Sequence, residues 1–269
     1  MTSFKTWQVR AYNTAAESEN KIHDDRVARR YGYKSALVPG VTVFSYLTHP
    51  AVVTWGEDWL DRGYAKIALK QPFYDDERVQ VEPKADGPSS YTCELKNPQG
   101  EVCASGTAAV RDLPESPSLR NDPPAPEAWE KPRATRETLE RLRKEGLGAV
   151  RVPWRGEAPG DRYTRVLDDM PSLVRTDQRA FAHPGFVLSL ANRALMANVT
   201  LGPWIHVESE IQNFSRLALG RTVIIESAVA DLFESNGHEF ADLEVRMFLK
   251  EGPPLMTAKH RVIYLLRES

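Results

Sequence analysis

Residues 183–199 read HPGFVLSLANRALMANV. Apolar Phe186, Leu190 and Leu195 fall close to one face when the segment is read at helical spacing. The pair Pro184-Gly185 stands at its start. The segment therefore predicts a long buried helix, around which the rest of this half of the chain is expected to fold.

A second segment, VPGVTVFSYL at 38–47, has the same character and opens with Pro39-Gly40. Pro50 follows it, and because proline has no backbone N–H we expect it to end or kink this helix. Pro39 and Pro184 are 145 positions apart. Little identity survives between the two halves, so their similarity rests mainly on pattern.

Runs with strand character follow both helices, and several alternate apolar and polar residues as half-buried antiparallel strands do. They cover 65–74, 78–85, 90–97 and 102–110 in the first half, and 205–214, 221–233, 239–249 and 255–266 in the second. The economical interpretation is an internal duplication, with room for one strand before each helix. Two such units could pair edge to edge or face to face.

A proline-rich segment separates the halves. Residues 112–133 contain six of the nineteen prolines and too few apolar residues for a core, which predicts an extended linker. A short charged helix is expected over 135–146, ended by Gly146. The predicted organisation is a first repeat at 1–111, a linker with a short helix at 112–150, and a second repeat at 151–269.

The composition is that of a soluble globular protein, with 41% hydrophobic and 27% charged residues. Lys and Arg number 35 against 37 Asp and Glu, so no strong field attracts nucleic acid or an anionic membrane. Cys93 and Cys103 are too few for a secreted disulfide framework and fit a reducing cytosol. The N-terminus lacks an apolar signal segment, and the most apolar stretch, 181–205, includes Asn192 and Arg193. We therefore expect a cytoplasmic protein without a membrane span.

The stretch that carries chemistry is Ser18-Glu19-Asn20-Lys21-Ile22-His23-Asp24-Asp25, followed by Leu37-Val38-Pro39-Gly40. It resembles the MaoC-like (R)-specific enoyl-CoA hydratase/dehydratase family, whose motif Asp-x-Asn-Pro-[Ile/Leu]-His precedes a short helix and a Pro-Gly. The motif resemblance covers roughly residues 18–40, and the pattern of helix and strands extends it to both halves. It implies an α+β double hotdog, with two antiparallel sheets each wrapped round a central helix.

Two positions depart from the family's motif: Lys21 replaces the proline, and Ser18 replaces the catalytic aspartate. A serine hydroxyl does not titrate near neutral pH, so it cannot act as the missing acid or base. Glu17 or Glu19 could supply a carboxylate through a shifted loop. Glu19 is favoured because it lies nearer His23 in the sequence.

Hydration of a 2-enoyl thioester needs one group to deprotonate water and one to protonate the α-carbon. The resemblance gives His23 this acid/base role, and Asn20 can orient the water or the loop without titrating. Negative charge develops on the thioester oxygen, and a backbone N–H at a helix N-terminus can stabilise it. We expect Gly40 and Val41 to supply that donor, although Gly40 could equally serve close helix–sheet packing.

Other polar residues have simpler interpretations. Asp24 and Asp25 suit the N-terminus of the following helix. The second half has no Asn-x-x-His element before Pro184, so it is expected to shape the acyl pocket and leave one active site per chain. His49, His206, His238 and His260 lack metal-ligand spacing, which predicts no metal site.

The leading hypothesis is a hydro-lyase of fatty acid metabolism that interconverts a 2-enoyl-CoA and a 3-hydroxyacyl-CoA without a cofactor. Its partner would be an acyl-CoA or acyl-carrier thioester, and a homodimer of double-hotdog chains is compatible with this. The alternatives are a non-catalytic acyl-CoA-binding protein, with Ser18 marking lost activity, and a hotdog thioesterase.

Overall fold

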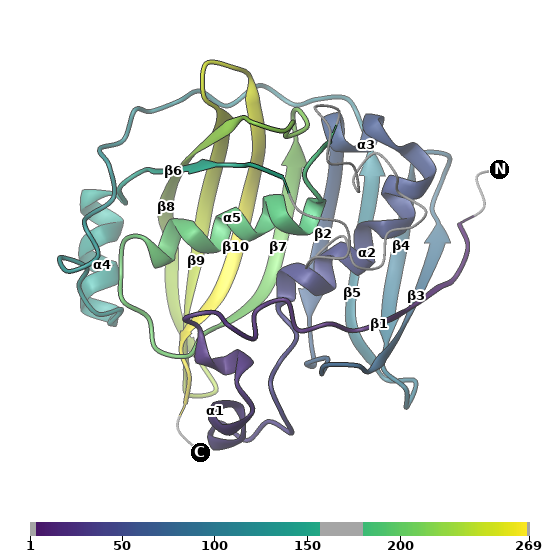
Figure 1. Cartoon of the computed structure of the whole chain (residues 1–269), viewed down its shortest axis with the longest axis horizontal. Helices are drawn as coiled ribbons and strands as arrows, with labels where there is room; N and C mark the ends of the chain where they lie inside the picture. Colours follow the sequence, from purple (N-terminus) through teal and green to yellow (C-terminus); the bar gives the residue numbers. More distant parts are fainter. Residues whose placement is uncertain (1–3, 157–179, 268–269) are drawn as a thin grey trace.

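The computed structural model describes residues 4–156 and 180–267. Within these residues ten strands form one antiparallel sheet, in the order β1-β3-β4-β5-β2-β7-β10-β9-β8-β6. Figure 1 shows the sheet curving behind two long helices, with the first repeat on one side and the second on the other. This is the predicted α+β double hotdog architecture.

Each repeat contributes five neighbouring strands. Those of the first are β1 (Trp7–Arg10), β2 (Gly63–Leu69), β3 (Arg78–Ala85), β4 (Ser90–Lys96) and β5 (Val102–Val110). Those of the second are β6 (Val150–Pro153), β7 (Ile205–Asn213), β8 (Thr222–Ser235), β9 (His238–Leu249) and β10 (Pro254–Leu265). All eight expected strands are present, and β1 and β6 are the strands that precede the helices.

The two repeats meet edge to edge. Strand β2 pairs antiparallel with β7, from Tyr64 opposite Gln212 to Ala68 opposite Glu208. The expected two sheets are therefore one continuous sheet. The physical reason is that each five-stranded unit has an edge of unpaired backbone groups, and pairing the two edges satisfies both.

The helices are η1 (Lys21–His23, a 3-10 turn), α1 (Asp25–Arg30), α2 (Gly40–Trp55), α3 (Glu57–Arg62), α4 (Arg136–Glu145) and α5 (Pro184–Met196). The long helices α2 and α5 lie side by side against the same face of the sheet (Figure 1). Four of their apolar side chains are completely buried: Phe44, Leu47, Leu188 and Leu190. None of the described helices combines the length and the apolar character needed to cross a bilayer.

Of the two expected effects of Pro50, ending the helix does not occur, because α2 continues through Pro50 to Trp55. The proline removes one backbone N–H, but the surroundings support the turn that contains it. Tyr91 of β4 donates a hydrogen bond of 2.7 Å to the Leu47 carbonyl, and the whole turn is buried against the sheet. Tertiary packing thus outweighs the local penalty.

The linker crosses the outer surface of the second repeat. Buried Glu226 of β8 accepts hydrogen bonds from the backbone N–H groups of Arg120 and Asp122, at 2.8 and 3.0 Å. Helix α4 follows, with Thr135 capping its N-terminus and Gly146 ending it. These hydrogen bonds hold the linker against the sheet.

Candidate active site

A cavity of about 1160 Å³ lies between the repeats. The first repeat lines it with segment 12–20, with His23 and with the start of α2. The second repeat contributes side chains of α5 and the segment that enters β7. The motif and the Pro-Gly helix start, well separated in the sequence, therefore border one space.

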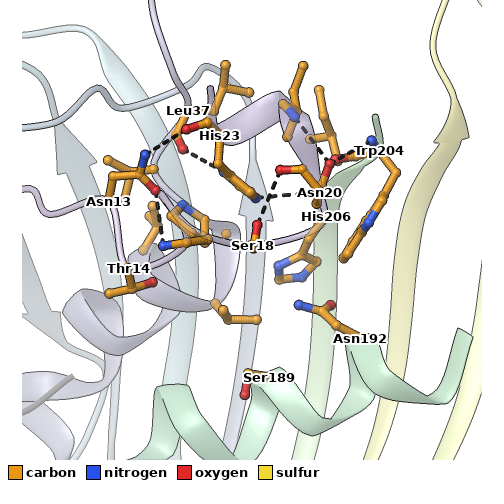
Figure 2. A pocket seen from close by; sticks show the side chains of 18 of the residues that line it. Asn13, Thr14, Ser18, Asn20, His23, Leu37, Ser189, Asn192, Trp204 and His206 are labelled. Atoms are coloured by element: carbon orange, nitrogen blue, oxygen red, sulfur yellow. Dashed lines mark hydrogen bonds between the residues drawn. The ribbon is translucent and has the colours of Figure 1, made fainter. Parts of the chain in front are cut away.

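His23 lies at the end of the 3-10 turn η1 and points into this cavity (Figure 2). Its Nδ1 lies 2.7 Å from the carbonyl oxygen of Leu37. A carbonyl can only accept, so Nδ1 carries the proton and donates. In the neutral ring, Nε2 is then unprotonated and can accept a proton or a hydrogen bond.

Burial affects the charge of His23. Removing the ring from water lowers the pKa of His23 below its ordinary value of 6.5, and the hydrogen bond to Leu37 opposes this only partly. At neutral pH the ring is therefore mainly uncharged. A neutral imidazole with an unprotonated Nε2 is the form that a general base requires.

Asn20 fixes the loop that carries His23. Its Oδ1 accepts hydrogen bonds from the backbone N–H groups of Ile22 and Trp204, at 3.3 and 3.2 Å. Its Nδ2 donates to the Trp204 carbonyl at 2.9 Å and lies 3.4 Å from Nε2 of His23. Since Trp204 belongs to the second repeat, this buried amide joins the two halves beside the histidine.

The first turn of α2 presents backbone donors. The amides of Thr42 and Val43 bond the Pro39 carbonyl, whereas those of Gly40 and Val41 bond no protein group within the described residues. Both residues border the cavity. Free N–H groups at a helix N-terminus are suited to an oxyanion.

Gly40 also serves packing. A Cβ at this position would lie 2.4 Å from both His206 Nδ1 and Leu69 Cδ1, closer than real Cβ atoms approach. The two interpretations of Gly40 are therefore compatible. A side chain would be excluded by the neighbours, and the bare backbone faces the cavity.

Ser18 and the two glutamates beside it also border the cavity but do not contact His23 through a hydrogen bond among the described residues. Ser18 borders the cavity and donates a hydrogen bond of 3.2 Å to the Asn20 carbonyl. Glu17 and Glu19 also border the cavity, but both are exposed. Within the described part of the chain, neither makes a hydrogen bond to His23.

Three residues have the structural roles that their positions suggest. Asp24 caps α1 by accepting from the Val27 amide at 3.0 Å, and Asp25 accepts from the Ala36 amide at 2.8 Å. His183 caps α5 through its Nδ1, which accepts from the Gly185 amide. Over residues 4–156 and 180–267, no cluster of His, Cys, Asp and Glu is arranged to hold a metal ion.

Sequence reasoning missed a group of polar residues in the second repeat. His206 and Ser209 of β7, His260 of β10 and Asn192 of α5 form a hydrogen-bonded chain, and both His206 and Asn192 border the cavity. Strand β7 contains a bulge where it pairs with β10. Arg261 of β10 lies opposite Glu208 and the next residue, Val262, lies opposite His206, so Val207 has no opposite residue on β10. This bulge puts His206 and Ser209, three residues apart, on the same buried face.

Comparison with solved structures shows the same fold. A proposed MaoC domain dehydratase from Chloroflexus aurantiacus J-10-fl superposes over 99% of this chain and 96% of its own, with a TM-score of 0.59 and 9% identity. A Mycobacterium tuberculosis protein described as a double hotdog covers 98% and 96%, with a TM-score of 0.58 and 10% identity. The dehydratase domain of RzxB from Pseudomonas fluorescens covers 96% and 93%, with a TM-score of 0.54 and 10% identity.

No protein-family model and no curated protein sequence matches the chain. The likeness to MaoC-like dehydratases is therefore a likeness of fold at very low identity. It establishes the double hotdog and leaves the chemistry to be argued from the site.

Proposed function

We propose that this chain is a hydro-lyase that reversibly hydrates a 2-enoyl thioester to a 3-hydroxyacyl thioester. The proposal rests on the protonation of the two ring nitrogens of His23 and on the position of the ring at the cavity. Its Nδ1 donates to the Leu37 carbonyl, and its unprotonated Nε2 lies beside Asn20 Nδ2 at the cavity. The Gly40 and Val41 amides, which bond no protein group among the described residues, border the same cavity. The resemblance of its loop to the hydratase motif points to the same chemistry.

In the proposed reaction His23 performs both proton transfers. Nε2 removes a proton from water as the water oxygen forms a bond to C3 of the enoyl group. The π electrons of the C2–C3 bond move onto the thioester as an enolate. The imidazolium then returns the proton to C2, which restores the neutral ring and gives the 3-hydroxyacyl product. These steps account for every proton and electron pair without a cofactor.

The enolate oxygen is the group that the start of α2 would stabilise. Preorganised amides near a developing oxyanion contribute about 2.7–4 kcal/mol each in well-studied enzymes. The amides of Gly40 and Val41 are the candidates, because they border the cavity without a protein partner in the described residues. The cavity, at about 1160 Å³, is large enough for an acyl thioester.

The test is product analysis with crotonyl-CoA. Hydration removes the enoyl chromophore and releases no thiol, and this is the expected result. Release of free CoA would instead make the chain a thioesterase. Binding with neither change would make it a non-catalytic acyl-CoA-binding protein.

Ser18 favours the binding alternative as a second candidate, because it stands where the family has its aspartate. Ser18→Asp separates the two. If the natural chain is inactive and Ser18→Asp hydrates crotonyl-CoA, the natural protein is a binding relative of the hydratases.

The carboxylates beside Ser18 are tested with Glu19→Gln and the matched Glu17→Gln. We propose Glu19 as the residue that assists His23, so Glu19→Gln should lower turnover while leaving thioester binding largely unchanged. Both glutamates are exposed, so solvent screens this assistance, and the loss should be smaller than for His23→Ala. Full activity of both variants would leave His23 without help from either.

A further inference from the structure

Two threonine hydroxyls meet beside the start of α2. Thr14 Oγ1, from the segment between β1 and η1, lies 2.6 Å from Thr42 Oγ1 in the first turn of the helix. Within the described residues neither hydroxyl makes another hydrogen bond. One hydroxyl proton therefore lies between the two oxygens, and the other has no acceptor among these residues.

Burial determines which hydroxyl donates. Thr42 is 3% exposed and does not border the cavity, whereas Thr14 is only partly buried and lines it. If Thr14 donated, the proton of the Thr42 hydroxyl would be buried without an acceptor, which is costly. Thr42 therefore donates to Thr14, and the proton of the Thr14 hydroxyl is free to point into the cavity.

Hydrogen bonds on both sides of Thr14 hold it in place. The Asn13 amide donates to Asp75 Oδ1 at 2.7 Å, and the Asn13 side chain donates to the His23 carbonyl at 3.0 Å. The Thr14 amide donates to the Tyr12 carbonyl at 3.0 Å. Figure 2 shows Thr14 next to Asn13 at one side of the site. A donor that is fixed in this way needs little reorganisation when a ligand arrives.

We propose that Thr14 is a substrate-binding residue that donates a hydrogen bond to a carbonyl oxygen of the acyl thioester. Thr42, its donor, directly follows Val41, whose amide bonds no protein group among the described residues and borders the same cavity. A substrate that lies against this turn meets a side-chain donor as well as backbone donors. The acceptor is the carbonyl of the thioester or that of the nearest amide in the pantetheine arm. The nature of the ligand rests on the proposed function.

The two threonines provide a matched pair of variants. Thr14→Val and Thr42→Val both remove the bond between the hydroxyls and keep the side-chain shape, but only Thr14→Val removes the free donor. With crotonyl-CoA, Thr14→Val should lower kcat/KM about five- to tenfold, the effect of one lost hydrogen bond, and Thr42→Val should stay within about twofold of wild type. Thr14→Ser keeps the hydroxyl and should recover most of the rate.

Thr48→Val is the folding control, because Thr48 is a buried threonine of α2 that bonds the Phe44 carbonyl and does not border the cavity. Equal losses of kcat/KM in Thr14→Val and Thr42→Val would show that only the bond between the hydroxyls matters, and would overturn the inference. A wild-type rate in Thr14→Val would also overturn it.

Isotope-edited infrared spectroscopy identifies the acceptor. Butyryl-CoA has no double bond to hydrate, and a hydrogen bond to a carbonyl lowers its stretching frequency. One sample carries 13C at the thioester carbonyl, and another carries it at the pantetheine amide nearest the thioester. In one of the two samples the labelled band should lie at higher frequency with Thr14→Val than with wild type. Equal frequencies in both samples would contradict the assignment of Thr14 as a donor.

Binding of butyryl-CoA also separates this inference from the proposed function. Titration calorimetry should give a dissociation constant about two- to tenfold higher for Thr14→Val than for wild type. If wild type hydrates no enoyl thioester but this difference is found, the proposed function fails and the role of Thr14 stands. If wild type hydrates crotonyl-CoA and Thr14→Val equals it in rate and affinity, only the role of Thr14 fails. If wild type binds no acyl-CoA, both fail.

Discussion

At the scale of single residues, the carbonyl of Leu37 determines which nitrogen of His23 can act. It holds the proton on Nδ1, 2.7 Å away, and so leaves Nε2 toward the cavity. The ring is also shielded from water, which disfavours its charged form. Both effects favour a base over an acid in the free protein at neutral pH.

The pH dependence of kcat/KM follows from this. His23 must be unprotonated to accept a proton from water, and its pKa is lowered from 6.5. Activity should therefore persist as pH falls through 6.5 and decline only at lower pH, with an acid limb belonging to the free enzyme. The measurement is kcat/KM for crotonyl-CoA from pH 5 to 8. An acid limb centred above pH 6.5 would contradict the assignment.

The sequence could single out candidate site residues only within one short segment. His23 and Asn20 lie three positions apart, and the resemblance depends on that spacing. The hydrogen-bonded chain that contains His206 could not be predicted. Its other members, Ser209, His260 and Asn192, come from two strands and a helix. Only the bulge in β7 puts His206 and Ser209 on one face.

At the scale of elements, the start of α2 packs tightly against the second repeat. A methyl group on Gly40 would overlap Leu69 and His206. Gly40→Ala should therefore lower the free energy of unfolding by about 1–3 kcal/mol, the usual cost of overpacking. Urea unfolding measures this. Gly202→Ala is the matched control, because a Cβ there meets nothing within 4 Å, and its change should stay within about 0.5 kcal/mol. Equal stability of the two variants would remove the packing role of Gly40.

The motif loop depends on the buried bonds between Asn20 and Trp204. Asn20→Ala would leave the amide and carbonyl of Trp204 without these partners, at a cost of about 1–3 kcal/mol in unfolding free energy. It should also lower turnover, because His23 is carried by the same loop. Asn97, whose side chain bonds the Gln99 and Glu101 amides in a surface turn, provides the control. If Asn97→Ala costs as much stability as Asn20→Ala, burial does not set the value of these bonds.

Most elements could be predicted from periodicity alone. The bounds expected for the strands 78–85 and 102–110 agree with β3 and β5. Within β3, buried Val79 and Val81 alternate with less buried neighbours, which is the period-2 pattern of a strand. Pro50 does not end α2, because the sheet and Tyr91 support that turn and local propensity takes no account of either. Local pattern therefore predicts where elements lie better than how far they extend.

At the scale of the whole molecule, the pairing of β2 with β7 makes one sheet from two repeats and puts a cavity between them. The duplication was visible in the sequence, because both helices begin with Pro-Gly. The edge-to-edge arrangement was not, since alternation says which face of a strand is buried and nothing about its neighbour. For the same reason, the sequence could not show which residues of the second repeat border the cavity.

Buried histidines should make the whole fold sensitive to acid. Burial lowers the pKa of His183 to about 3, of His206 to about 4, and of His260 well below 6.5. Below pH 6.5 the unfolded chain binds protons that the folded chain does not, so stability is lost as pH falls, by about 1.4 kcal/mol per pH unit for each such histidine. Urea unfolding at pH 7, 6 and 5 measures this. Constant or rising stability from pH 7 to 5 would contradict it.

In the proposed function, His23 catalyses hydration of an enoyl thioester in the cavity between the repeats. The most direct test is the reaction of crotonyl-CoA in D2O, followed by mass spectrometry of the acyl product, for wild type and for His23→Ala with its fold checked by circular dichroism. We expect a 3-hydroxybutyryl product with one deuterium at the α-carbon, formed at least about a hundredfold more slowly by His23→Ala. Near-wild-type hydration by His23→Ala, or a wild type that forms no hydrated product, would contradict it.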